Sequence, residues 1–217
     1  MRAEQISSNV VIVARHFNPS ILDRHWAITN GILSENDFEQ GCIFTPVLSQ
    51  INARDFKLLI TPDQLQLVPS DFSHEAGAII LSKVGAIVER LPHTPYVAIG
   101  LNFIWHIIPT DEGMRALSRR LFFKEDNPIY QSFDTDNALF GAYLSKNYLN
   151  SRLKLDIKPA TIMHEGQLSE LLQFSFNFHR DIVDQRVENI LELLRNWSQA
   201  KDFTTEFITN LLNRSNS

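Results

Sequence analysis

The stretch CIFTPVLSQINARDFKLLITP, from Cys42 to Pro62, decides the predicted fold, because it recurs in looser form as ALFGAYLSKNYLNSRLKLDIKP from Ala138 to Pro159. In both copies an apolar strand, a polar turn that carries asparagine and an alternating strand follow one another. With one inserted residue, the matched positions are Phe44 with Phe140, Leu48–Ser49 with Leu144–Ser145, Lys57–Leu58 with Lys154–Leu155, Ile60 with Ile157, and Pro62 with Pro159. The repeat predicts an internally duplicated protein.

The first half, residues 1–93, reads as strand, helix, three strands and helix. VVIVARHF, from Val10 to Phe17, is continuous, apolar and rich in β-branched residues, which is typical of a buried strand. Asn18-Pro19 is a helix start signal and Asn30-Gly31 a helix stop signal. Strands are expected at residues 42–49, 55–61 and 64–68, with a turn at Pro62-Asp63, and a helix is expected from Ser73 to Leu91.

The second half, residues 94–217, repeats this order. YVAIGLNF, from Tyr96 to Phe103, matches VVIVARHF and places Phe103 where Phe17 stands. Thr110 is expected to cap a short helix whose first turn holds Asp111 and Glu112. Strands are expected at residues 138–147, 152–158 and 172–179, with an inserted turn at 160–170. An apolar stripe at Val187, Ile190, Leu191, Leu194 and Trp197, extended by Phe203, Phe207, Leu211 and Leu212, predicts a C-terminal helix.

These elements predict an α+β fold in which two β-α-β-β-β-α halves pack intimately into one unit. Such halves join into a mostly antiparallel sheet with the long helices on one face. Gly77 and Gly85 lie inside the first long helix, where glycine costs about 1 kcal/mol relative to alanine. We therefore expect this helix to pack closely on the sheet.

A resemblance follows from this order of elements and from the strand YVAIGLNFIWHI, which precedes a chain that ends in a long helix. At fold level the chain resembles the saddle of TATA-binding-like proteins or a helix-grip fold. It also resembles an uncharacterised, sporadically distributed bacterial family with the same order of elements. The resemblance covers most of the chain and rests on pattern, so it implies a fold and a bacterial origin but brings no activity with it.

Composition limits the class of protein and the compartment. The 217 residues are 44% hydrophobic and 21% charged, and the formal net charge is −5 without a basic block. A nucleic-acid-binding stripe is therefore not expected. The single cysteine, Cys42, permits no internal disulfide. No run approaches the 18 or so apolar residues of a membrane span, and the N-terminus does not read as a signal peptide. These features predict a cytoplasmic protein.

Alternation places one set of polar residues on the sheet face opposite the helices, because neighbours of a core residue on a strand point to the other side. The candidate binding residues on this face are His16, Asn102, His106, Lys154, Asp156, Lys158, Ser175, Asn177 and His179. Such a surface could bind a ligand, a peptide or a metal. The alternative is that it is the solvated face of an antiparallel sheet, or that some of the histidines lie in the core.

The sequence contains one loose catalytic pattern. Asp134 or Asp136, followed by Asp156 and Lys158 on a strand, is similar to a metal-dependent nuclease site, in which acidic groups hold Mg²⁺. A third acid is not evident, and alternation explains Asp156 and Lys158 as surface residues. We therefore predict no catalytic residues, no metal site and no cofactor.

Three functional hypotheses remain open at this point. The first is a non-enzymatic interaction module that binds another protein or a second copy of itself. The second is a small-ligand binder with a cavity between the sheet and the long helices. The third is the metal-dependent hydrolase described above. The sequence favours the first, because it shows a duplication, no convergent catalytic set and an apolar C-terminal helix.

Overall fold

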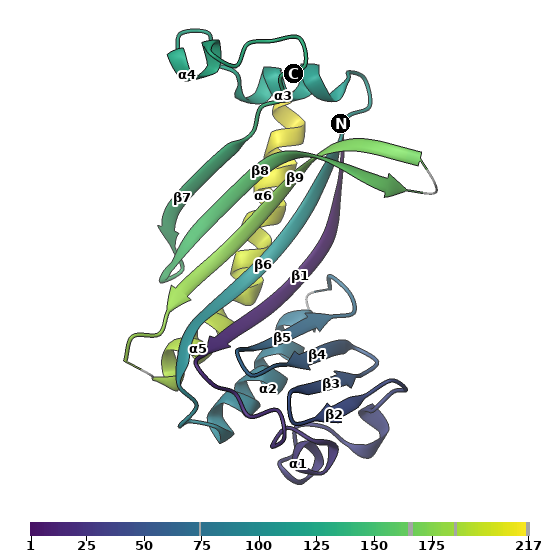
Figure 1. The fold of residues 1–217 in the computed structure, drawn as a ribbon, viewed down its shortest axis with the longest axis vertical. Helices are drawn as coiled ribbons and strands as arrows, with labels where there is room; N and C mark the ends of the chain where they lie inside the picture. The colour runs from purple at the N-terminus through teal and green to yellow at the C-terminus, as the bar shows by residue number, and fades with distance from the viewer. Residues whose placement is uncertain (74, 165–166, 185, 216–217) are drawn as a thin grey trace.

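The computed structural model describes residues 1–73, 75–164, 167–184 and 186–215 (Figure 1). Within these residues the chain forms a nine-stranded antiparallel sheet in the order β2-β3-β4-β5-β1-β6-β9-β8-β7. The strands are β1 (Arg2–Ala14), β2 (Ile43–Thr45), β3 (Leu48–Asn52), β4 (Phe56–Ile60), β5 (Gln64–Pro69), β6 (Tyr96–Ile108), β7 (Ala142–Tyr148), β8 (Ser151–His164) and β9 (Gln167–Asp181). The helices are α1 (Arg24–Thr29), α2 (Glu75–Arg90), α3 (Met114–Phe122), α4 (Pro128–Gln131), α5 (Val187–Arg195) and α6 (Trp197–Ser215).

The two predicted halves share one sheet, because β1 and β6 pair along almost their whole length. Their register places Asn9 opposite Asn102 and Val10 opposite Leu101. Strand β5 pairs with the other side of β1 and β9 with the other side of β6. The α+β class and the antiparallel sheet are thus confirmed.

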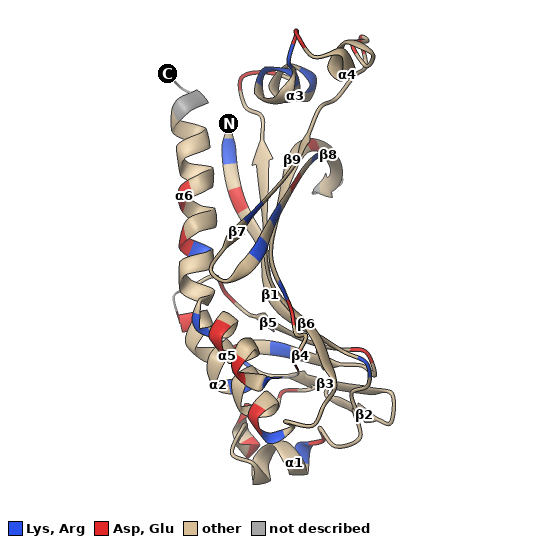
Figure 2. Cartoon of the chain, turned by 90° about the vertical axis from the view of Figure 1, so that its left-hand side faces the viewer, with Lys and Arg blue, Asp and Glu red and all other residues tan. Residues whose placement is uncertain are grey.

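Helices α2, α5 and α6 lie on one side of the sheet, as Figure 2 shows. We call this side the helix face and the other side the open face. The core lies between the two layers, where Ile12, Leu101, Phe103 and Phe178 are fully buried. Trp197, at the start of α6, packs on Phe103 with ring centroids 4.8 Å apart. The predicted helices on one face are therefore present.

The expectation that the two glycines of α2 pack against the sheet is wrong, because both face other helices. A Cβ atom on Gly77 would lie 3.0 Å from Cδ1 of Trp197, and one on Gly85 would lie 3.3 Å from Cδ2 of Leu191. Both neighbours belong to the C-terminal helices α5 and α6. The glycines therefore let α2 approach α5 and α6 closely.

Four predicted element starts are wrong. Strand β7 begins at Ala142 and not at residue 138. Strand β1 begins at Arg2, well before Val10, and ends at Ala14. Helix α1 begins at Arg24 and is capped by Asp23, not by Asn18, although it ends at Asn30 as predicted. Helix α3 begins after Gly113, so Thr110 does not cap it. The hydroxyl of Thr110 instead accepts a hydrogen bond from the N-terminal ammonium group.

Two predicted loops also differ from the structure. The expected strand at 42–49 is a tight hairpin of β2 and β3, so that four strands and not three separate α1 from α2. The expected inserted turn at 160–170 is a continuation of β8 and β9, which stay paired from Pro159–Leu172 to His164–Gln167. Only residues 165–166 of that turn lie outside the described residues. The hairpin projects beyond the neighbouring strands (Figure 1).

The duplication itself stays a prediction, and part of the proposed match is wrong. Ser49 is fully buried on the helix face, whereas Ser145 is exposed on the open face. A one-residue offset therefore separates the two strands, since neighbouring residues point to opposite faces. Phe17 is buried like Phe103 but lies beyond the end of β1, so the two are not equivalent strand residues.

Among the described residues, no helix has the length and apolar character needed to cross a membrane.

Candidate functional site

The structure brings most of the predicted polar residues together on the open face. Cross-strand pairing places Lys154 opposite Asn177, Asp156 opposite Ser175, and Lys158 opposite Gln173. Asn102 lies opposite Asn177, and His106 opposite Gln173. Directly opposed residues of an antiparallel pair share one face, so these side chains occupy neighbouring positions on the open face.

A row of three asparagines crosses the centre of this face. Nδ2 of Asn177 donates to Oδ1 of Asn102 at 2.6 Å, and Nδ2 of Asn102 donates to Oδ1 of Asn9 at 2.8 Å. All three side chains are half-buried. Sequence reasoning missed Asn9 because it began the strand at Val10. The length of YVAIGLNFIWHI could have indicated it, since a partner strand of equal length would start well before Val10.

The three histidines have separate environments and do not form one site. His16 lies beyond the end of β1 and is exposed, so its predicted place on the sheet face is wrong. His106 is only 7% exposed, at the end of the sheet where α3 contacts β9. His179 lies at the opposite end of β9, with Nε2 at 3.0 Å from Oδ1 of Asp181. His106 is thus a buried histidine, as one alternative held.

The acidic residues of the nuclease pattern are occupied by cationic partners. Arg119 of α3 forms a two-pronged ion pair with Asp134, and hydrogen bonding from this guanidinium lowers the pKa of the Asp134 carboxyl. Arg115 pairs with Asp136 at 3.2 Å, and Lys158 lies 3.9 Å from Asp156. Across the described ranges, no group of three His, Cys, Asp or Glu residues could hold a metal ion.

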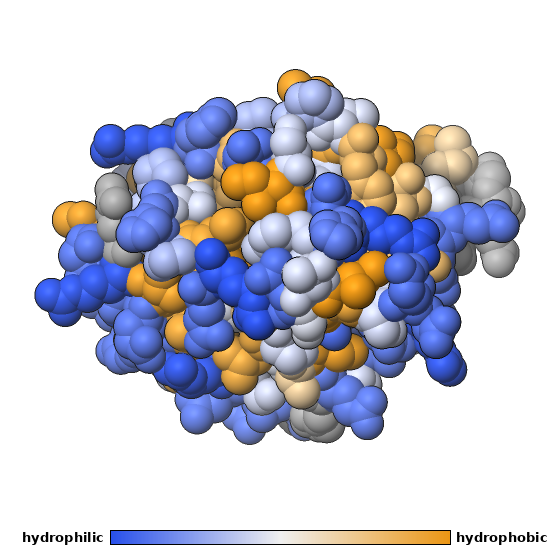
Figure 3. Space-filling view, turned by 90° about the horizontal axis from the view of Figure 1, so that it is seen from below, coloured by the Kyte–Doolittle hydropathy of each residue, from blue (hydrophilic) through white to orange (hydrophobic). Residues whose placement is uncertain are grey.

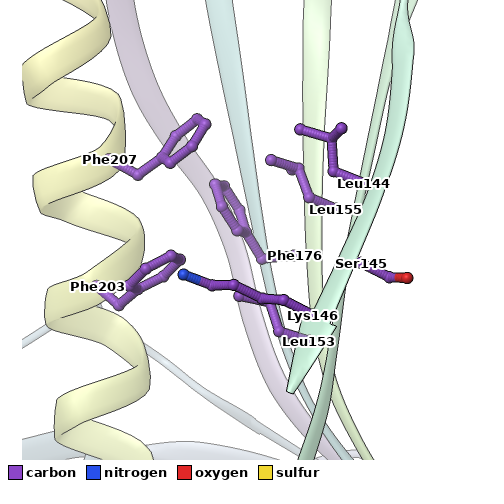
Figure 4. Close-up of a pocket in the computed structure, with 8 residues that line it drawn as sticks. All are labelled: Leu144, Ser145, Lys146, Leu153, Leu155, Phe176, Phe203 and Phe207. Atoms are coloured by element: carbon purple, nitrogen blue, oxygen red, sulfur yellow. The ribbon is translucent and has the colours of Figure 1, made fainter. Parts of the chain in front are cut away.

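An apolar cleft opens on the helix face, between α6 and the strands at the end of the sheet (Figure 4). We call it the α6 cleft. Its volume is about 330 Å³. Phe203 and Phe207 of α6 form one wall, Phe176 of β9 forms the floor, and Leu144, Leu153 and Leu155 of β7 and β8 form the other wall. Ser145 also borders the cleft, but Figure 4 shows its side chain turned away from α6.

The cleft exists because α6 does not extend over the last two strands. Phe207 packs on Phe176 with ring centroids 5.5 Å apart, which fixes α6 above β9. Beyond β9, no second helix of the described residues covers the helix face of β8 and β7, and Leu144 on β7 remains 53% exposed. Leu144 therefore adds exposed apolar surface to the wall of the cleft, next to Leu153 and Leu155.

Lys146 closes one end of the cleft (Figure 4). Its side chain runs from β7 toward α6, and Nζ lies 4.6 Å from the ring centroid of Phe203 and 5.2 Å from that of Tyr148. A cation over an aromatic face is attracted to the ring. The lining of the cleft therefore consists of apolar side chains with one ammonium group at its end.

The opposite end of the sheet has a corner built from comparable parts. Counted outward from the central pair, β4 and β3 on one side take the places that β8 and β7 take on the other. There residues 22–33 of the chain itself, which include α1 and which we call the α1 segment, pack on the helix face beside α2. Their apolar contacts are made by Leu22, Trp26, Ile32 and Leu33. This α1 corner retains a void of only about 10 Å³.

The surface outside the two corners is mixed. The positions of cationic and anionic residues are scattered along the whole chain in Figure 2, and Figure 3 shows apolar patches interspersed with polar side chains at the end that carries α1. The α6 cleft differs from this background because its apolar side chains are contiguous.

A comparison with protein-family models, with curated proteins and with solved structures finds no match to this chain.

Proposed function

We propose that this protein is a non-enzymatic binding module and that the α6 cleft receives an apolar segment of a partner protein. One observation carries the proposal: the α1 corner is filled by apolar side chains of the chain itself, whereas the α6 cleft, at the matching place on the sheet, is open. Burial of apolar surface is the main favourable term in most protein association. A partner segment that filled the cleft would remove Leu144, Phe203 and Phe207 from water.

The experiment compares two single substitutions on neighbouring residues of β7. Leu144→Glu places a charge in the cleft, and Tyr143→Glu places the same charge on the open face, where Tyr143 is 64% exposed. The wild-type protein and the two variants are each immobilised and incubated with an extract of the source organism. We expect the same partner chain on wild type and Tyr143→Glu, and its loss on Leu144→Glu.

The proposal fails if all three proteins retain the same chains, or if Tyr143→Glu loses the partner and Leu144→Glu does not. Because both side chains are largely exposed, each substitution should change the free energy of unfolding by only about 0.5 kcal/mol. Urea unfolding of both variants checks that a lost partner does not reflect a lost fold.

A second candidate is a small amphiphilic molecule, which the sheet–helix cavity hypothesis would place in the same cleft. The volume of about 330 Å³ lies at the lower end of the ~300–1,000 Å³ typical of ligand pockets. Native mass spectrometry of the purified protein, with and without mild denaturation, separates the two candidates. The small-ligand candidate is favoured if the wild type carries a bound molecule that dissociates on denaturation and if Leu144→Glu does not carry it.

A further inference from the structure

The ammonium group of Lys146 carries the argument for the chemistry of the partner. It lies at one end of an otherwise apolar cleft, over the rings of Phe203 and Tyr148. Among the described residues no carboxylate lies within ion-pair distance of it, whereas Lys158, on the neighbouring strand, has Asp156. A guest that enters the cleft therefore meets one cation, and an anionic group at that end of the guest would complement it.

The α1 corner shows how this fold binds an apolar segment beside a lysine. Nζ of Lys83 on α2, which lines that corner, donates to the carbonyl oxygen of Ile32 at 2.7 Å. Ile32 follows the C-terminal end of α1, whose C-cap is Asn30. The ammonium group thus binds a backbone carbonyl just beyond the C-terminal end of α1, where a cation is favoured.

The walls of the cleft favour a helical guest over an extended one. Phe203 and Phe207 are four residues apart on α6, and the chain that fills the α1 corner is helical where Trp26 and Ala27 line it. Residues at this spacing lie on one face of a helix, about 6 Å apart along its axis. A helix bound beside α6 would cover the end of the sheet with apolar side chains, as α1 does beside α2.

We propose that the guest of the α6 cleft is an amphipathic helix of a partner protein, bound with its C-terminal end at Lys146 and with a carboxylate in its last turn. The inference rests on the proposed function. Two apolar residues at positions i and i+4 fill the space between Leu144 and the two phenylalanines of α6, and the carboxylate pairs with the ammonium group of Lys146.

The test uses a displayed library of random 16-residue peptides. Peptides are selected on the wild-type protein, and those that also bind Leu144→Glu are removed. We expect the remaining sequences to share apolar residues at i and i+4, and to carry Asp or Glu near the C-terminal end. Synthetic peptides from this pool should bind Lys146→Met about three- to fivefold more weakly than wild type, as for a partly exposed ion pair.

The matched control is Lys154→Met, which removes a lysine from the open face of the next strand and should leave affinity unchanged. Charge reversal gives a second readout, because Lys146→Glu should select peptides with Lys or Arg at the end where the wild type selects acids. Lys146 is exposed, so its variants should keep the unfolding midpoint of the wild type.

The outcomes separate the two proposals. If no peptide depends on Leu144, the proposed function fails and this inference fails with it. If Leu144-dependent peptides show no acidic preference and bind Lys146→Met as tightly as wild type, the binding function stands and the inference is overturned. Peptides with strictly alternating apolar residues would also overturn it, because they would indicate a strand added to the edge of β7.

Discussion

Gly77 shows at the scale of one residue why α2 can lie against α6. A Cβ atom there would lie 3.0 Å from Cδ1 of Trp197 and 3.1 Å from Oγ of Ser198. Trp197 is only 2% exposed, so its indole ring has little room to move. Gly77→Ala should gain about 1 kcal/mol in helix propensity but lose more through overpacking. We expect a net loss of about 1 kcal/mol in the free energy of unfolding, measured by urea denaturation.

Gly85→Ala on the same helix is the matched control. The nearest atom to its Cβ would be a methyl carbon of Leu191 at 3.3 Å, which a change of rotamer can move. This variant should be neutral or slightly more stable than wild type. Equal stabilisation by both substitutions would show that α2 does not need Gly77 for its approach to Trp197.

The buried hydroxyl of Tyr96 makes the free energy of unfolding fall at alkaline pH. Burial raises the pKa of its hydroxyl to about 12 from the ordinary value of 10.0, and the hydroxyl donates to the carbonyl oxygen of Leu91 at 3.0 Å. The folded state holds the proton more tightly than the unfolded state. Its contribution is therefore complete below pH 10 and is lost as the pH rises from about 10 to about 12, by up to roughly 3 kcal/mol.

The measurement is the free energy of unfolding of wild type and Tyr96→Phe between pH 8 and pH 12. At pH 8 the variant should be less stable by about 1 kcal/mol, because it lacks one hydrogen bond. The difference should shrink or change sign toward pH 12. A difference that stays constant across the range would show that Tyr96 ionises equally well in both states.

At the scale of elements, Gly141 controls the position of edge strand β7. It immediately precedes the strand, and a Cβ atom there would overlap the carbonyl oxygen of Ile157 on β8. Gly141→Ala must therefore displace the start of β7, and with it Leu144. We expect a loss of about 2 kcal/mol in the free energy of unfolding and at least tenfold weaker binding of cleft-dependent peptides.

Gly113→Ala is the control for this substitution, since nothing lies within 4 Å of a Cβ atom at that position. It should change the free energy of unfolding by no more than about 0.5 kcal/mol. It should leave peptide affinity unchanged. Wild-type affinity in Gly141→Ala would show that the position of β7 does not matter for the cleft.

The sequence predicts those elements whose signal is local. The hairpin of β4 and β5 follows from the alternation of Phe56, Leu58 and Ile60 and from the turn at Pro62-Asp63, and it is present. The starts of α1 and α3 were wrong because several neighbouring residues could serve as caps. Asp23 caps α1 in place of Asn18, and Thr110 binds the N-terminus, a contact between residues distant in sequence.

The candidate site also has a part that local sequence signals predict and a part that they do not. Alternation placed Asn102, Lys154 and Asn177 correctly on one face, because side-chain direction on a strand depends only on parity. The α6 cleft was expected only in general terms, as a sheet–helix cavity. Its position depends on how far α6 reaches across the sheet, which the contact between Phe207 and Phe176 determines. Contacts of that kind cannot be read from a single sequence.

At the scale of the whole molecule, stability should fall from the centre of the sheet to its ends. Strand β6 has β1 on one side and β9 on the other, and Ile99, Leu101 and Phe103 on it are fully buried. Strand β7 ends the sheet, and most of its side chains are exposed. Amide groups open with free energies that follow such differences in burial and pairing.

Hydrogen exchange followed by mass spectrometry tests this gradient. Peptides from β6 should exchange only through global unfolding, and those from β7 by local opening that is faster by several orders of magnitude. Binding of a cleft peptide should slow exchange in β7 and α6 and leave β2 unchanged. If β7 exchanges as slowly as β6 in the free protein, its edge is covered in solution. Protection that then weakens on dilution would identify a second copy as the occupant, because only self-association depends on the concentration of the chain itself.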